Sequence, residues 1–150
     1  MPITPSASIY VYSLTSDIIA ELQNDSEKST TSASYVMVKE TKISAMPPMV
    51  TVPHTVRVYF EMRTGSATYT AYGTIYKNGV AIGTQRTNST TSYVAYTEDI
   101  SNVAINLNDL LQVYGHGYAS GYQCYIRNFR ALGLLTAFPT AQKFGGVLDA

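Results

Sequence analysis

Few side chains in this sequence could act as a catalytic base. The two histidines are His54 and His116, and neither lies in a recognisable motif with a nucleophile and an orienting group. His116 stands between two glycines, Gly115 and Gly117, which would let a ligand approach closely. The simpler interpretation is a strand or loop histidine with no ligand role. We keep His116 as a candidate ligand-binding residue on the strength of its neighbours.

The nucleophile with the strongest intrinsic reactivity is Cys124, the only cysteine of the chain. It alternates with Tyr122 and Ile126 in a segment that looks like a strand, so we expect a buried, inert thiol. One cysteine cannot form an intramolecular disulfide or a thiolate zinc cluster. The sequence therefore excludes the disulfide-rich secreted class.

Carboxylates are the remaining candidates for chemistry. A glycoside hydrolase needs a pair of them, and those away from the ends and loops are Glu61, Glu98, Asp99 and Asp109. Nothing in their spacing sets two apart. A calcium site would draw on Asp99, Asn106, Asn108 and Asp109. We favour turn capping for these residues, because Asp and Asn bond to nearby backbone in turns and no complete calcium-loop motif is present. We expect no metal, no cofactor and no enzymatic activity.

Tyrosine is the one residue type that could support recognition, with 13 copies and no tryptophan. Tyr72 and Tyr76 share a predicted strand face with threonines, and Tyr93 and Tyr96 bracket the next strand. Exposed tyrosine rings can stack on sugars or pack on another protein. The alternative, which we weigh equally, is that these rings fill the core and its rims. The candidate ligand-binding set is Tyr72, Tyr76, Tyr93, Tyr96 and His116.

Composition narrows the class of protein further. The chain has 150 residues, the length of one domain, and 13% are charged, against about 25% in a typical soluble domain. Ten Lys and Arg balance ten Asp and Glu, so the net charge is zero and there is no field to gather nucleic acid or anionic lipid. Zero net charge also removes repulsion between copies. The sequence begins without a signal-peptide pattern and has no run of about 18 apolar residues, so we expect synthesis in the cytoplasm.

Alternation of side chains predicts strands along most of the chain. Residues 55–63 place Val56, Val58, Phe60 and Met62 on one face, the pattern of a half-buried antiparallel strand. Asn78-Gly79 predicts a type I′ hairpin turn after a strand over 67–77. We expect further strands over 35–43, 93–98, 110–118 and 121–132. This spacing indicates an all-β, antiparallel, jelly-roll-like β-sandwich of seven to nine strands, with Ile75, Ile82, Val113 and Ile126 also inside.

The two ends of the chain differ from its middle. We expect residues 1–34 to form an N-terminal arm and polar loop, with a short helical turn over 17–22, residues 35–133 the sandwich, and residues 134–150 an extended tail. Apolar residues in such arms need a place to dock. A neighbouring subunit is our expectation, and folding back onto the same sandwich is the alternative. The predicted oligomer contacts are Ile9, Val11, Leu134, Leu135, Phe138, Phe144, Val147 and Leu148.

The passage from Ala71 to Gly133 resembles small jelly-roll-like modules on the virion surfaces of tailed phages and archaeal viruses. The matching features are the Lys77-Asn78-Gly79 hairpin, the strand that follows Asn108-Asp109, and the closing strand from Tyr125. These are turn and core patterns, so no catalytic residue is carried over. The same strand pattern resembles trimeric C1q-like and tumour-necrosis-factor-like jelly rolls, which implies a homotrimer or higher oligomer.

Together these features predict a non-enzymatic virion protein of the capsid, decoration, turret or fibre type. Its expected location is the virion, after synthesis in the host cytoplasm. Its expected partners are copies of itself and other virion proteins, with no nucleic acid and no membrane. The alternative is a carbohydrate-binding module that uses exposed tyrosines to bind a glycan.

Overall fold

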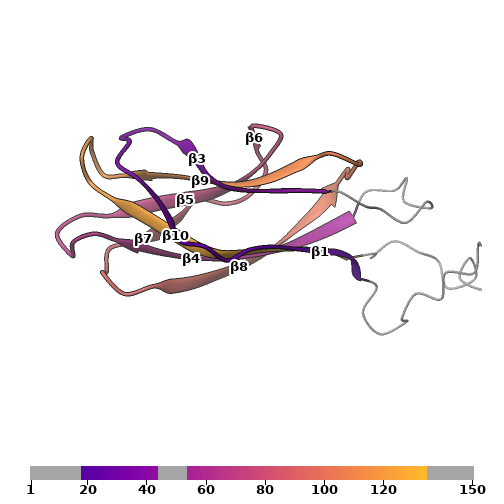
Figure 1. Ribbon diagram of the computed structural model, residues 1–150, viewed down its shortest axis with the longest axis horizontal. Coiled ribbons are helices and arrows are strands. Elements are labelled where there is room, and N and C mark those ends of the chain that lie inside the picture. Colours follow the sequence, from indigo (N-terminus) through magenta and orange to yellow (C-terminus); the bar gives the residue numbers. More distant parts are fainter. Residues whose placement is uncertain (1–17, 44–53, 135–150) are drawn as a thin grey trace, which may run out of the picture.

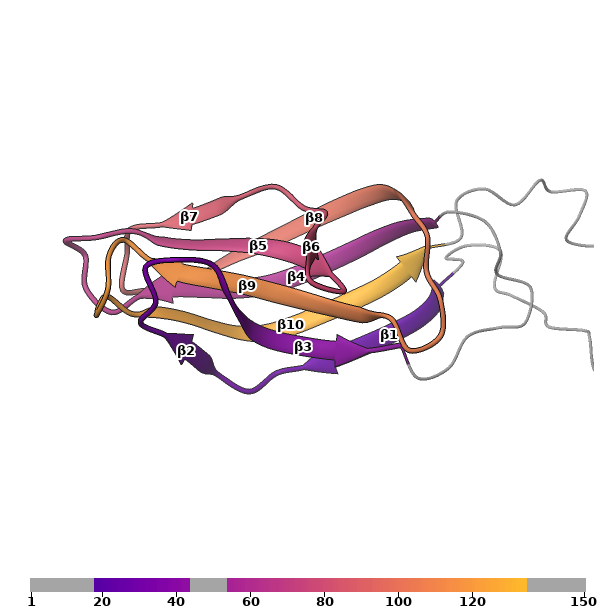
Figure 2. The same cartoon turned by 90° about the horizontal axis from the view of Figure 1, so that it is seen from above.

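The computed structural model describes residues 18–43 and 54–134. All of its regular elements there are strands, arranged as two layers (Figures 1 and 2). They are β1 (Ile18–Asn24), β2 (Lys28–Thr30), β3 (Val36–Lys42), β4 (His54–Thr64), β5 (Ala71–Lys77), β6 (Val80–Ala81), β7 (Arg86–Asn88), β8 (Val94–Val103), β9 (Leu110–Gly117) and β10 (Cys124–Leu134). Within these residues no helix has the length and hydropathy needed to cross a membrane.

The strands form two antiparallel sheets of five strands each. One sheet has the order β1-β10-β4-β8, with β2 also paired to β10, and the other has the order β3-β9-β5-β6, with β7 also paired to β5. The chain crosses repeatedly between the layers: β3 and β4 lie in different sheets, as do β4 and β5, β8 and β9, and β9 and β10. The predicted all-β, jelly-roll-like sandwich is confirmed, with ten strands in the described residues where seven to nine were expected.

Most of the predicted strands are present with small changes at their ends. The alternation over 55–63 is confirmed, since Val56, Val58, Phe60 and Met62 are each at most 2% exposed. Asn78 and Gly79 both have positive φ, 49° and 80°, as a type I′ turn requires. The strand predicted over 67–77 begins only at Ala71, because residues 65–70 form turns, one closed by the Tyr69 amide bonding to the Ser66 carbonyl.

The N-terminal part of the described chain differs from expectation. The helical turn predicted over 17–22 is wrong: residues 18–24 form β1, which pairs with β10 along its C-terminal half. The stretch predicted as polar loop contains β2, which pairs with the N-terminal half of β10. Pairing with β10 supplies hydrogen bonds that local propensity does not reveal. Two strands of the sandwich therefore lie within the segment 1–34, and β10 ends at Leu134, the first residue of the predicted tail.

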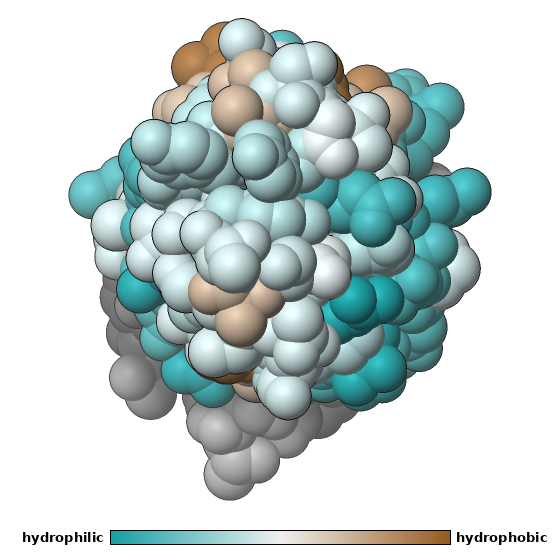
Figure 3. All heavy atoms as spheres, turned by 90° about the vertical axis from the view of Figure 1, so that its left-hand side faces the viewer, coloured by the Kyte–Doolittle hydropathy of each residue, from teal (hydrophilic) through white to brown (hydrophobic). Residues whose placement is uncertain are grey.

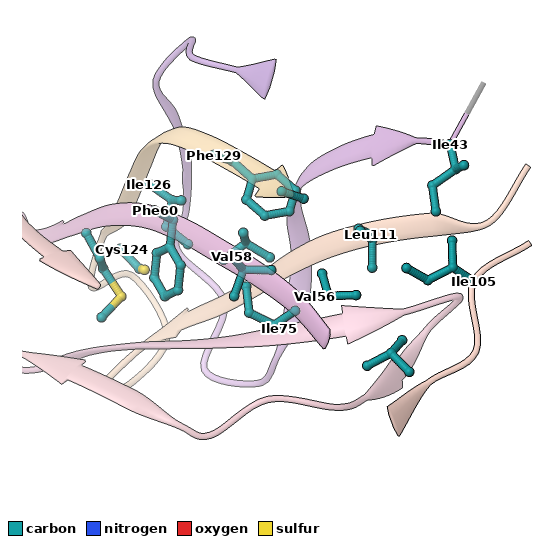
Figure 4. Close-up of a cluster of buried hydrophobic side chains, with 14 of the residues drawn as sticks. Ile43, Val56, Val58, Phe60, Ile75, Ile105, Leu111, Cys124, Ile126 and Phe129 are labelled. Atoms are coloured by element: carbon teal, nitrogen blue, oxygen red, sulfur yellow. The ribbon is translucent and has the colours of Figure 1, made fainter. Parts of the chain in front are cut away.

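The core lies between the sheets and takes side chains from both (Figure 4). Ile75, Val113 and Ile126 are fully buried as predicted, whereas Ile82 is half-buried and packs on the cluster's edge. Cys124 is also fully buried, and burial raises the pKa of its thiol to about 12. The prediction of an unreactive, buried thiol agrees with this environment.

The two ends of the sandwich differ in which parts of the chain they contain. Ile18 and Thr55 both pair with Leu134, and His54 pairs with Val103, so β1, β4 and β10 meet at one end. β3 ends there too, beside the start of β9. The described segments therefore begin and end together at one end, on the right in Figure 1. The opposite end carries the loops β2–β3, β4–β5, β7–β8 and β9–β10 (Figure 2).

Candidate binding surfaces

The outer face of the β1-β10-β4-β8 sheet carries four ion pairs, two between neighbouring strands and two between a strand and the β1–β2 loop. Its charged side chains pair as Arg57–Asp99, Arg127–Glu61, Arg63–Glu27 and Arg130–Asp25. We call this surface the charged face. The Arg57–Asp99 pair is bidentate, at 2.7 and 2.8 Å. Each of these charges therefore has a partner within the same protein. Opposite charges on adjacent strands also stabilise the sheet locally.

Glu61 is the most engaged carboxylate of the charged face. Burial would raise its pKa, but hydrogen bonds from the Tyr59 hydroxyl and the Arg127 guanidinium outweigh that effect and lower the pKa. Arg63 lies over the Tyr125 ring at 3.8 Å from its centroid, and Arg127 lies over the Tyr93 ring at 3.8 Å. The Tyr93 and Tyr125 rings of this face are therefore covered by guanidinium groups.

The outer face of the β3-β9-β5 sheet is different. It gathers five rings, which we call the aromatic face: Tyr35, Tyr72, Tyr76, Tyr114 and His116. Tyr72 on β5 stacks on His116 of β9, with centroids 4.5 Å apart and ring planes 8° apart. Tyr76 stacks on Tyr114 at 3.9 Å and 14°. None of the five carries a carboxylate, an ammonium or a guanidinium group.

Tyr35 joins the two stacked pairs of the aromatic face. Its ring meets His116 edge-on at 4.5 Å and lies 6.2 Å from Tyr76. Its hydroxyl accepts a hydrogen bond of 3.0 Å from Thr74, and burial raises the pKa of that hydroxyl. His116 Nδ1 donates to the Gly117 carbonyl at 2.6 Å, which fixes the ring. The aromatic face is therefore an ordered, continuous array.

The strand register explains why these rings meet. Tyr72 is directly opposite His116 in the β5–β9 ladder, and Thr74 is opposite Tyr114. Side chains two residues apart share a face, so Tyr72, Thr74 and Tyr76 point outward while Ile75 points into the core. The same alternation on β9 turns Tyr114 and His116 outward.

The structure divides the predicted ligand-binding residues among three places. Tyr72, Tyr76 and His116 lie together on the aromatic face. Tyr93 lies on the charged face beneath Arg127. Tyr96 packs at 5.4 Å on Phe60 at the rim of the core, and its hydroxyl donates to the Thr87 carbonyl. These five residues therefore do not form one site.

Sequence reasoning did not select two members of the aromatic face. Tyr114 could have been found, because it is two residues before His116 on the same strand. Tyr35 lies just before β3 and reaches the array through the pairing of β3 with β9, for which the sequence carries no local signal. Of the predicted oligomer contacts, Ile9, Val11, Leu135, Phe138, Phe144, Val147 and Leu148 lie outside the described residues, and the side chain of Leu134 is not described.

The carboxylates considered for catalysis and calcium binding have partners within the chain. Asp109 accepts hydrogen bonds from the Asn78 side chain and the Asn106 amide, both 2.8 Å, and pairs with Lys77 at 3.0 Å. Burial would raise the pKa of Asp109, but these bonds lower it. Its predicted turn-capping role is confirmed. In residues 18–43 and 54–134, no group of three or more His, Cys, Asp or Glu side chains is arranged to hold a metal ion.

Comparisons with known proteins relate the chain to others by fold. No protein-family model matches the sequence, and a search of curated proteins found no significant match. Among solved structures, a chain of the T13 IBDV viral particle matches with a TM-score of 0.51 and 12% identity, over 77% of this chain and 30% of that one. The match thus spans less than a third of the viral chain.

Two further similar structures have lower scores. The CBM22-1 xylan-binding domain of Paenibacillus barcinonensis Xyn10C matches with a TM-score of 0.45 and 10% identity, over 81% of this chain and 97% of that domain. The tobacco streak virus coat protein matches with a TM-score of 0.36 and 11% identity, over 80% and 88%. At the level of the fold, the chain is similar to a jelly-roll module of a virus particle, as the sequence resemblance predicted.

Proposed function

We propose that this protein is a non-enzymatic structural or surface component of a virion that associates with copies of itself and with other virion proteins. The observation that carries the proposal is the aromatic face, an ordered array of rings without a charged partner on a jelly-roll sandwich. The fold supports the same proposal, because the similar IBDV chain belongs to a viral particle.

The geometry of the aromatic face favours a protein partner over a sugar. Side chains stand roughly perpendicular to a sheet, so cross-strand stacked rings present mainly their edges and hydroxyls outward. A sugar stacks on a ring face, and one face of Tyr72 and one of Tyr76 are already occupied by His116 and Tyr114. Ring edges and tyrosine hydroxyls pack well in protein interfaces, where tyrosine is enriched.

A second copy of the chain is the partner that this surface suits best. The formal net charge is zero, so two copies do not repel one another over long distances. A surface of ring edges and hydroxyls can complement itself across a two-fold axis. The charged face, whose charges are paired within the chain, has less to gain from a partner.

The chain ends provide a second route to association. β1 begins and β10 ends at the same end of the sandwich, so the segments 1–17 and 135–150 attach there together. We propose that their apolar residues, Ile9, Val11, Leu135, Phe138, Phe144, Val147 and Leu148, contact neighbouring subunits.

Light scattering on the full chain and on a chain that ends after Leu134 tests this proposal. We expect an oligomer of three or more copies for the full chain and a smaller mass for the shortened one. Ending after Leu134 keeps β10 complete, so circular dichroism should show that the shortened chain retains a strand-dominated spectrum. A full chain that stays monomeric at all concentrations would contradict the proposal.

A further inference from the structure

Four loops at the end of the sandwich opposite Ile18 and Leu134 form a surface that we call the tip, which adjoins the aromatic face at Tyr35 and the charged face at Tyr93. They are residues 31–35, 65–70, 89–93 and 118–123. Figure 3 views this end directly: most of it has the pale colours of intermediate hydropathy, and strongly hydrophilic residues gather toward one side.

The composition of the tip is unlike that of the rest of the chain. The four loops contain no Asp, Glu, Lys, Arg or His, and no Leu, Ile, Val, Met, Phe or Pro. They consist of Ser, Thr, Tyr, Gly, Ala and one Gln, and every loop contains a tyrosine. Loops rich in Tyr, Ser and Gly supply rigid aromatic contacts and adaptable hydrogen bonds in binding proteins such as antibodies.

Hydrogen bonds connect the four loops to one another. The Gly121 amide donates to the Thr31 carbonyl at 2.9 Å, joining the β9–β10 and β2–β3 loops. The Gly65 amide donates to the Gln123 carbonyl at 3.2 Å, joining the β4–β5 and β9–β10 loops. The hydroxyls of Thr70 and Ser89 bond at 2.8 Å, joining the β4–β5 and β7–β8 loops.

Two strand residues next to the loops, Asn88 and Gly117, fix the conformation of the tip. Asn88 is buried at the end of β7; its side-chain amide donates to the Met62 and Ser92 carbonyls, and its oxygen accepts from the Thr90 amide. At Gly117, a Cβ would lie 1.9 Å from the Tyr122 carbonyl oxygen, so only glycine lets the β9–β10 loop fold back this closely. The tip is thus ordered before any ligand binds, which lowers the entropy cost of binding.

Two tyrosines project from this ordered base. Tyr118 is 67% exposed and Tyr122 is 40% exposed, and Tyr118 has the highest exposed fraction of the large hydrophobic residues in the described part of the chain. Their rings meet edge to face at 6.4 Å, and Tyr122 also packs at 4.3 Å on Tyr69. Tyr118 therefore has more uncovered surface for stacking than the half-buried, stacked rings of the aromatic face.

We propose that the tip is a binding site for neutral carbohydrate, with Tyr118 and Tyr122 as its stacking platform. Apolar faces of a sugar pack on tyrosine rings, and sugar hydroxyls exchange hydrogen bonds with side chains such as those of Thr31, Thr91 and Ser120, all exposed. Nucleic acids and acidic glycans need cationic groups, and the tip loops contain none. The nearest guanidinium groups, Arg63 and Arg127, lie over Tyr93 at the border with the charged face and are paired with Glu27 and Glu61. Aliphatic anchors for a protein partner are also absent from the tip. This site is independent of the proposed virion role, and it differs from the sugar site that the sequence suggested at Tyr72 and Tyr76.

The experiment titrates the full chain with maltohexaose, xylohexaose and mannohexaose, with heparin as the acidic comparison, and measures binding by calorimetry and saturation-transfer NMR. We expect at least one neutral oligosaccharide to bind at concentrations up to about 1 mM and heparin not to bind. Tyr118→Ala should weaken this binding roughly tenfold or more. Because the Tyr118 side chain is mostly exposed, this variant should fold normally.

Two control variants separate the tip from other surfaces. Leu107→Ala alters a residue that is 54% exposed at the opposite end, and it should leave binding unchanged. Tyr72→Ser alters the aromatic face and should also leave it unchanged. Binding lost in Tyr72→Ser but kept in Tyr118→Ala would overturn the proposal, as would preference for heparin or no saturable binding by any of the three neutral sugars. Tip-dependent binding to ovalbumin that persists after enzymatic deglycosylation would instead identify a protein ligand and overturn it as well.

Discussion

The outer surfaces of the two sheets differ in how their side chains interact with one another. On the charged face, arginine side chains pair with carboxylates of neighbouring strands or of the β1–β2 loop, and guanidinium groups cover the rings of Tyr93 and Tyr125. On the aromatic face, rings stack on one another, and the array has no charged cover. The charges of the charged face are paired within one chain, whereas burial of the aromatic face against another protein would remove apolar ring surface from water.

This difference shows that counting tyrosines does not locate a recognition surface. Tyr93 and Tyr72 were equal candidates from the sequence, yet Tyr93 is engaged by Arg127, and its hydroxyl donates to Glu27. What distinguishes them is the side chain that the fold brings against each ring, Arg127 at Tyr93 and His116 at Tyr72. Changes on each surface should therefore have different consequences for folding and for assembly.

The largest effect should come from the core that both faces share. Val58, at 1% exposed, lies between the sheets, and Val58→Asp would bury a charge without a partner. We expect a loss of about 4–5 kcal/mol or more in the free energy of unfolding, measured by chemical denaturation, or no folding at all. Thr97→Asp, on the exposed side of β8, is the control and should change the free energy of unfolding by less than about 0.5 kcal/mol. Equal effects of the two changes would refute the assignment of inner and outer positions.

An intermediate effect is expected at Glu61 on the charged face. Its pKa is lowered in the folded state, so its stabilising contribution is present above the unfolded-state pKa of 4.5 and is lost as the pH falls through the folded-state pKa. Glu61→Gln should cost about 1–2 kcal/mol at pH 7 and should flatten the acid dependence of stability. Urea denaturation across the acid range measures both. An unchanged acid dependence would mean that the Tyr59 and Arg127 bonds contribute little.

A smaller effect on folding is expected at the aromatic face. Tyr72→Ser removes one cross-strand stacked pair, which is worth about 0.2–1 kcal/mol. The thermal midpoint of a dilute, monomeric sample should therefore fall only slightly. A loss as large as that of a core residue would show that the aromatic face is part of the folding core and would weaken the contrast between the surfaces.

The smallest effect is expected for the most exposed ion pair. Arg57 and Asp99 side chains are 48% and 44% exposed, and such pairs contribute little to stability. Arg57→Gln should leave the thermal midpoint nearly unchanged. The hydrogen bond from Arg57 holds the pKa of Asp99 below its ordinary value, so an NMR titration of the variant should show that pKa rising.

The sequence predicts the fold wherever the signal is local. Alternation over 55–63 and the Asn78-Gly79 turn are examples, because period-two burial and positive φ depend on residues next to one another. β1 was misread as a helical turn because it is an edge strand stabilised by β10, more than 100 residues later. The aromatic face depends on the register of β5 against β9 and of β9 against β3, which no local pattern encodes.

The same limit applies to the tip. The four loops are far apart in the sequence and individually read as ordinary polar turns. Only the fold brings their tyrosines and hydroxyls to one end and shows which bonds connect them. Once the strands are assigned, however, the sequence alone shows that the four loops share the same unusual composition, and this similarity could point to a common surface.

The most direct test of the account is the mass of matched variants of the two faces in solution, measured by sedimentation velocity on the full chain. The aromatic variant is Tyr76→Ser with Tyr114→Ser, and the charged-face control is Arg57→Gln with Arg130→Gln. The account predicts an oligomer for the unmodified chain and for the control, and a shift toward smaller species for the aromatic variant. An oligomer that survives the aromatic changes but dissociates with the control would contradict it, as would a chain that is monomeric throughout.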